Sequence, residues 1–117
     1  MTSESVERVI ENIEREYNKE DKVILVYDGE IHESIAGIVA GRVRERFNLP
    51  TIIMTKGKDM PKGSARSIEG YNMFEELNKC KDLIDKFGGH PMAAGLSVRE
   101  ENLSALKKAL NEKCDLT

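Results

Sequence analysis

The chain has 117 residues, of which 39% are hydrophobic and 33% charged, with a formal net charge of −3. This length and balance are typical of one folded domain and exclude a disordered chain or a protein with two cores. No apolar run approaches the ~18 residues of a membrane helix, and the first residues do not form a signal peptide. We therefore expect a soluble, cytoplasmic domain whose two cysteines, Cys80 and Cys114, stay reduced.

The first elements are an amphipathic helix and a buried strand. Apolar residues at three- and four-residue spacing predict a helix over residues 4–17, and residues 23–27 form an apolar run of strand length. A strand that is apolar on both faces belongs inside a sheet covered on both sides. We take residues 1–20 as a linker helix that leads in from a preceding domain, and 21–117 as a separate domain.

The next elements form a β–α–β unit. A helix is expected over residues 31–47, ended by Asn48-Leu49-Pro50, and a second buried strand over 51–54. Two such strands joined by a crossover helix are parallel, and the crossover is right-handed. An exposed loop with several lysines should follow at 56–62.

The remaining elements are shorter. A strand is predicted over 64–68, and Asn72 with Glu75 fits a helix N-cap. One or two short helices should then end at a glycine turn after Phe87, before a strand at 92–98 and a closing helix at 100–113. The fold class is thus α/β: a single domain with a mixed, mainly buried sheet, helices on both faces and a right-handed β–α–β unit.

A glycine-rich stretch, Phe87-Gly88-Gly89-His90-Pro91-Met92-Ala93-Ala94-Gly95-Leu96, offers backbone rather than side chains. Glycine lets a ligand approach the main chain, and consecutive N–H groups can form an anion nest beside the imidazole of His90. The alternative interpretation is that Gly88 caps a helix, Gly89 makes a turn, and His90 is an ordinary surface or core histidine.

A second stretch, Gly63-Ser64-Ala65-Arg66-Ser67-Ile68-Glu69-Gly70, carries a guanidinium and two hydroxyls. The planar fork of Arg66 suits a phosphate, and Ser64 and Ser67 can add donors. The alternative for Arg66 is a surface salt bridge, for example with Glu69. The net negative charge argues against non-specific attraction to nucleic acid, but a local basic site is compatible with it.

In this order and spacing, the two stretches resemble the C-terminal substrate-binding module of DHH-family phosphoesterases, more narrowly the RecJ branch of single-strand-specific 5′-to-3′ DNA exonucleases. The resemblance runs from about Lys22 to Leu110. It implies a domain that grips nucleotide phosphates beside a two-metal catalytic domain of the same parent chain, with single-stranded DNA as partner and no membrane. Such parents are hydrolases, and a role in DNA repair is implied.

The resemblance also implies the site. Ser64, Arg66 and Ser67 are identified as phosphate contacts, and Gly88, Gly89 and His90 as the phosphate-contacting turn. Three further candidates are more weakly indicated: Met92 and Ala93 as part of the same wall, and His32 ahead of the second helix. The family usually has Trp-His where this chain has Ile31-His32, so a capping or structural role is favoured for His32.

Catalytic residues are not expected in this chain. It has two histidines and no Asp-His-His triplet, and its aspartates show no metal-ligand pattern. We expect no cofactor here, while a divalent metal, Mn or Mg, is implied for the missing catalytic domain. The chain alone should not cleave DNA, and with no Trp it should bind through phosphates rather than by base stacking.

Three other interpretations stay open. A sister DHH-family phosphodiesterase acting on short oligoribonucleotides or cyclic dinucleotides more often has three glycines before the histidine, whereas this chain has Gly88-Gly89-His90. A stand-alone nucleic-acid-binding module without a catalytic partner is compatible with the sequence. A purely structural interaction domain would leave Arg66 and His90 without a function.

Overall fold

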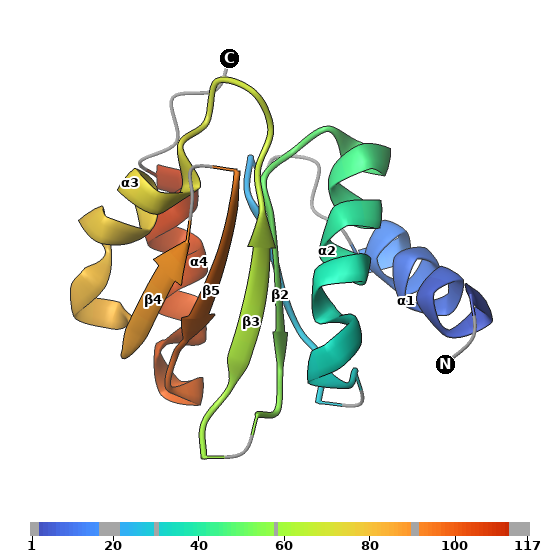
Figure 1. The fold of residues 1–117 in the computed structure, drawn as a ribbon, viewed down its shortest axis with the longest axis horizontal. Coiled ribbons are helices and arrows are strands. Elements are labelled where there is room, and N and C mark those ends of the chain that lie inside the picture. The colour runs from blue at the N-terminus through green and yellow to red at the C-terminus, as the bar shows by residue number, and fades with distance from the viewer. Residues whose placement is uncertain (1–2, 17–21, 30, 58, 90–91, 113–117) are drawn as a thin grey trace.

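The computed structural model describes residues 3–16, 22–29, 31–57, 59–89 and 92–112. Its centre is a five-stranded sheet in the order β1-β2-β3-β5-β4 (Figure 1). The strands are β1 (Ile24–Tyr27), β2 (Thr51–Thr55), β3 (Lys62–Arg66), β4 (Lys86–Gly89) and β5 (Ala93–Ser97). Within the described ranges, no helix is both long and apolar enough to cross a membrane.

The predicted β–α–β unit is present. Strands β1 and β2 pair in parallel, from Ile24 opposite Thr51 to Tyr27 opposite Met54, and helix α2 (Glu33–Phe47) connects them. The other neighbouring strands pair antiparallel, so the sheet is mixed. This order places the two apolar strands at one side of the sheet and the small, polar strands at the other.

Helices cover both faces of the sheet. Helix α1 (Ser3–Glu16) lies beside α2 on one face, and α3 (Met73–Lys79) and α4 (Leu103–Glu112) lie on the other (Figure 1). Because side chains alternate along a strand, β2 serves both cores. Ile53 packs with Val39 and Val43 of α2, whereas Ile52 and Met54 belong to the core under α3 and α4.

One side chain joins the start of the sheet to the last helix. The Asn111 side-chain oxygen accepts hydrogen bonds from the backbone N–H groups of Lys22, at 2.6 Å, and Val23, at 2.9 Å. Its amide nitrogen donates to the Val23 carbonyl at 3.1 Å and to the Lys107 carbonyl at 2.9 Å. Asn111 thus satisfies backbone groups at the entry to β1 that would otherwise have no partner.

The predicted helix N-cap is confirmed, because the Asn72 side chain accepts a hydrogen bond from the Glu75 N–H at 3.1 Å. The prediction that the chain reaches a glycine turn directly from a helix is wrong. The short 3-10 helix η1 (Lys81–Leu83) is followed by Ile84, which is extended, and residues 86–89 form strand β4. The closing helix is shorter than predicted, since η2 (Glu100–Asn102) precedes α4.

Candidate functional site

Strands β3, β5 and β4 carry small or cationic side chains on one side of the sheet. Helix α2 packs on this side of the sheet but reaches only to β3, so β5 and β4 are not covered by it. On β5 and β4 this side is half-exposed or exposed, whereas Ala65, Ala94 and Leu96 on the opposite side are buried. We call this surface the open face. It consists of Lys62, Ser64 and Arg66 from β3, Ala93, Gly95 and Ser97 from β5, and Lys86 and Gly88 from β4.

The Arg66 side chain lies against helix α2 because Gly37 leaves room for it. A methyl group at Gly37 would lie 2.6 Å from the Arg66 Nη2 atom and 3.8 Å from the Ser64 hydroxyl oxygen. The Nη1 atom of Arg66 donates to the Ala65 carbonyl at 2.9 Å. A glycine inside a helix lowers its stability, and here that glycine provides space for a guanidinium.

Strand register brings the two sequence motifs together. Arg66 pairs with Ala93 across β3 and β5, and Ala94 pairs with Gly89 across β5 and β4. Neighbouring strands lie ~4.8 Å apart, so Arg66 and the Gly88–Gly89 backbone are about 10 Å apart across the sheet. The glycine backbone of β4 therefore lies toward the Arg66 end of the sheet, while the guanidinium itself lies against α2.

The two glycines of β4 differ in what they require. Gly89 has a φ of 141°, and a methyl group there would lie 2.5 Å from the Ala93 carbonyl oxygen and 2.6 Å from the Ala94 Cα. A methyl group at Gly88 would meet nothing within 4 Å. Gly89 is therefore needed by the fold itself, whereas Gly88 keeps an exposed stretch of edge-strand backbone uncovered.

Ser67 is placed beside the site but faces inward. It is fully buried, and its hydroxyl donates to the Tyr71 carbonyl at 2.6 Å. Its N–H donates to the Met92 carbonyl at 2.8 Å. Ser67 thus fixes the chain after β3 against the residue that precedes β5, and its hydroxyl is occupied within the domain. Met92 is 44% exposed at this same end.

Arg44 is a residue that the sequence interpretation missed. It lies on the last turns of α2, and its Nη1 atom donates to the Ser67 carbonyl at 3.3 Å. It borders a pocket of about 360 Å³ with Ser67 and Met92, and the carboxylate residues Glu45 and Glu69 line the same pocket. The signal was present in the sequence, because Arg44 follows Gly37 by seven residues and so lies on the same helix face.

Two predicted candidates lie elsewhere. His32 is exposed and directly precedes α2, whose first turns lie beside Thr55 and Lys62, at the opposite end of β3 from Arg66. The structure therefore does not bring His32 to Arg66 and Gly89. His90 lies outside the described residues, as does Pro91.

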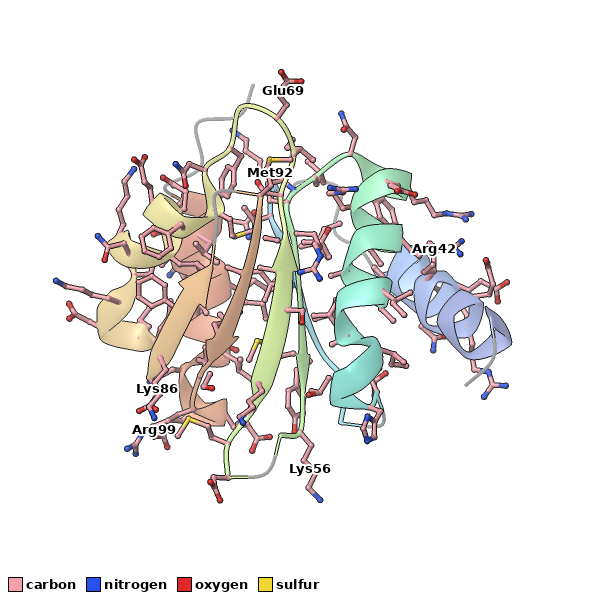
Figure 2. All side chains as sticks on the ribbon, in the orientation of Figure 1. Arg42, Lys56, Glu69, Lys86, Met92 and Arg99 are labelled. Atoms are coloured by element: carbon pink, nitrogen blue, oxygen red, sulfur yellow. The ribbon has the colours of Figure 1, made fainter. Side chains whose placement is uncertain are left out.

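The open face is positive. Its strands contribute Lys62, Arg66 and Lys86 and no carboxylate, and Figure 2 shows Lys86 and Arg99 at one end of this half of the sheet and Met92 at the other. Within the described ranges, no three His, Cys, Asp or Glu residues are grouped so as to hold a metal ion. The arrangement suits an anionic ligand long enough to contact both the guanidinium and the exposed backbone of β4, about 10 Å away across the sheet.

Comparison with known proteins gives a consistent result. A family model described as the DHHA1 domain matches residues 20–115. The single-stranded-DNA-specific exonuclease RecJ of Bacillus subtilis is 39% identical over 119 residues, which cover 100% of this chain and 15% of that protein. The Escherichia coli protein of the same name is 36% identical over 107 residues, covering 87% of this chain and 18% of that protein. The chain thus spans less than a fifth of these relatives.

Solved structures agree with the sequence comparison. The crystal structure of RecJ from Thermus thermophilus in complex with Mg²⁺ superposes with a TM-score of 0.81 and 30% identity, covering 92% of this chain and 17% of that one. The C-Ala domain of alanyl-tRNA synthetase from Aquifex aeolicus has a TM-score of 0.60 at 15% identity, covering 76% of this chain and 90% of that one. The second likeness shows a shared fold alone.

Proposed function

The chain belongs to the DHHA1 domain family, and from this premise we propose that it is the substrate-binding domain of a RecJ-like 5′-to-3′ single-stranded-DNA exonuclease. In this proposal it grips the phosphates of the DNA strand, while a catalytic domain elsewhere in the parent chain holds divalent metal, Mn or Mg, and performs hydrolysis. Residues 1–20 lead in from that domain, and 21–117 form the binding domain. A cytoplasmic location is part of the proposal.

The observation that carries this proposal is that Arg66 and the Gly88–Gly89 backbone lie about 10 Å apart, toward one end of strands that contribute no carboxylate to the open face. Arg66 donates its two-pronged guanidinium to a phosphate, and Ser64 adds a hydroxyl from the same side of β3. Gly88 offers exposed backbone to the same ligand. Holding the strand in one position lowers the entropic cost of the reaction that follows.

The remaining candidates take supporting roles. Ser67 positions the segment after Arg66 through its buried hydrogen bonds, while Met92 and Ala93 form the wall beside the guanidinium. His90 remains a proposed phosphate contact in the segment between β4 and β5. His32 lies near the end of β3 that carries Lys62, away from Arg66. It is therefore proposed only as a contact to a more distant part of the bound DNA.

A nuclear magnetic resonance titration tests this function. The chain is titrated at low salt and without metal with a short 5′-phosphorylated single-stranded deoxyoligonucleotide. Amide shifts should cluster at residues 64–67, 88–89 and 92–93. Arg66→Ala should weaken binding at least about tenfold, as expected for a charged hydrogen bond, and added salt should weaken it further.

Arg42→Ala is the matched control, because it removes the same charge from an exposed position on α2 whose side chain points away from the open face (Figure 2). It should leave affinity nearly unchanged. Equal losses for Arg66→Ala and Arg42→Ala, or shifts confined to other surfaces, would contradict the proposed site.

A further inference from the structure

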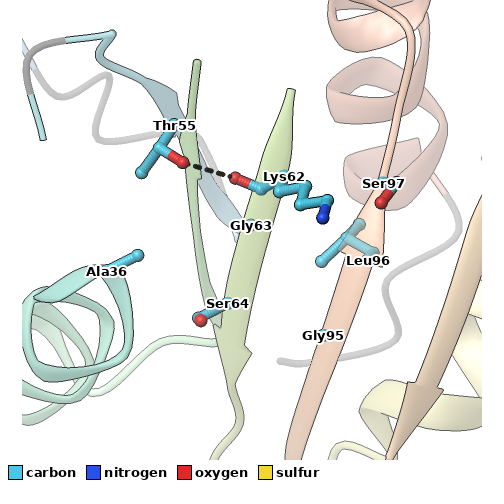
Figure 3. A pocket seen from close by; sticks show the side chains of 8 residues that line it. All are labelled: Ala36, Thr55, Lys62, Gly63, Ser64, Gly95, Leu96 and Ser97. Carbon is cyan, nitrogen blue, oxygen red and sulfur yellow. Dashed lines mark hydrogen bonds between the residues drawn. The ribbon is translucent and has the colours of Figure 1, made fainter. Parts of the chain in front are cut away.

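A second pocket lies on the open face, away from the Arg66 end. It has a volume of about 230 Å³ and is bordered by Lys62, Ser64, Gly95 and Ser97, with Ala36 of α2 on one side (Figure 3). Gly95 on β5 leaves the strand backbone uncovered at its floor, and Gly63 borders the pocket through its backbone. None of the residues so far assigned to the phosphate grip, except Ser64, borders this pocket.

The polar groups around this pocket suit an anion. Lys62 is exposed, and its side chain extends from β3 toward Ser97 on β5 (Figure 3). Ser64 and Ser97 are half-buried. Within the part of the chain that the structure describes, the Lys62 ammonium and the hydroxyls of Ser64 and Ser97 make no hydrogen bond or ion pair. The pocket therefore presents one cation and two hydroxyl donors that are available to a ligand.

The rim that carries Lys62 is held in place. The Thr55 hydroxyl donates to the Lys62 carbonyl at 3.0 Å, and Thr55 itself is buried. Lys62 also pairs with Thr55 on β2 and with Ser97 on β5. The backbone of Lys62 is thus fixed on both sides, so only its side chain has to be ordered when a ligand binds, which limits the entropic cost.

Spacing along β3 separates this pocket from the first phosphate site. Lys62 and Arg66 are four residues apart on one strand face, which corresponds to about 13 Å. A single phosphate cannot contact both side chains at that separation. Both can be engaged together only by a ligand that carries phosphates at intervals, as a nucleic-acid strand does.

We propose that Lys62 and Ser97, at the end of the pocket away from Ser64 and Arg66, bind a second backbone phosphate of the same single strand whose first phosphate is held at Arg66. This inference rests on the proposed function and extends it, because the DNA would then bind the open face at two phosphates along β3 rather than at one. Affinity should then depend on strand length, since a mononucleotide occupies only the Arg66 end.

The test compares two ligands and two lysine variants. Thymidine 5′-monophosphate and a 5′-phosphorylated thymidine tetranucleotide are titrated into the chain and into Lys62→Gln and Lys56→Gln. Lys56 is the matched control, because it is an exposed lysine near the same end that does not border the pocket. Thermal unfolding verifies that each variant is folded.

The wild-type chain should bind the tetranucleotide more tightly than the monophosphate. Lys62→Gln should weaken tetranucleotide binding by about two- to fivefold, the size expected for an exposed ion pair, and lower the slope of log affinity against log salt by about one. It should leave monophosphate binding unchanged, and Lys56→Gln should change neither ligand.

Two results would overturn this inference. One is equal affinity of the wild-type chain for both ligands, and the other is equal behaviour of Lys62→Gln and Lys56→Gln. Arg66→Ala distinguishes this failure from failure of the proposed function. If Arg66→Ala weakens both ligands while Lys62→Gln weakens neither, only the second pocket is wrong; if Arg66→Ala weakens neither, the phosphate grip itself is wrong.

Discussion

The two faces of the sheet formed by β3, β5 and β4 differ in how far they are buried, although neighbouring residues of each strand contribute to opposite faces. On one side Ala65, Ala94 and Leu96 are at most 5% exposed and belong to the core under α3 and α4. On the other side, Ser64 and Gly95 leave the backbone accessible. Stability and ligand contact therefore depend on different side chains one position apart, and substitutions in adjacent residues should separate the two properties.

The largest difference should appear between Leu96 and Gly95. Leu96→Ala removes a buried side chain and should lower the free energy of unfolding by about 2–5 kcal/mol. Gly95→Ala should change it by no more than about 0.5 kcal/mol, since the added methyl group would meet only the Gly63 carbonyl oxygen, at 3.9 Å. Urea unfolding measures both. Equal losses would show that the open side contributes to the core.

The adjacent glycines of β4 give the next largest difference. Gly89→Ala should cost about 1–3 kcal/mol, because φ near 141° is unfavourable for alanine and the methyl group would meet the Ala93 and Ala94 backbone. Gly88→Ala should leave stability nearly unchanged but weaken oligonucleotide binding, because its methyl group projects onto the open face. Unfolding and titration of each variant separate the effects. Weakened binding without lost stability in Gly89→Ala would contradict this assignment.

The smallest effect is expected on helix α2, where two glycines provide a matched pair. Gly37→Ala should displace the Arg66 guanidinium and weaken oligonucleotide binding several-fold, on the order of 1 kcal/mol. A methyl group added at Gly41 would meet no atom within 4 Å. Gly41→Ala should therefore stabilise the helix by about 0.5–1 kcal/mol and leave oligonucleotide binding unchanged. Titration together with thermal unfolding measures both. Unchanged binding in Gly37→Ala would show that Arg66 does not need its present position.

Periodic apolar residues made most of the fold predictable. The parallel strands, the crossover helix and the Asn72 cap follow from patterns that local physics imposes on the sequence. Strand β4 could not be found this way, because Lys86-Phe87-Gly88-Gly89 contains a single apolar side chain and two residues that disfavour strands. Its pairing with β5 is a tertiary interaction that overrides local preference.

The positions of the candidate site residues were predictable in part. Arg66 and Gly88 were identified because their motifs resemble a known family, and strand pairing brings them to one face. Gly37 and Arg44 were missed because their importance depends on how closely α2 packs beside β3. The inward orientation of Ser67 was hidden for the same reason, since its partner, the Tyr71 carbonyl, is defined only by the turn that follows.

The hydrogen bonds of Asn111 have a consequence for how this domain comes apart. They connect residues 88 positions apart, so the last helix and the first strand are held by the same side chain. Loss of α4 would therefore leave the N–H groups of Lys22 and Val23 without their partner and loosen β1 at its entry. A pulling force applied to the chain ahead of Lys22 would therefore act on α4 as well as on β1. The first strand and the last helix of the domain should resist such a force together.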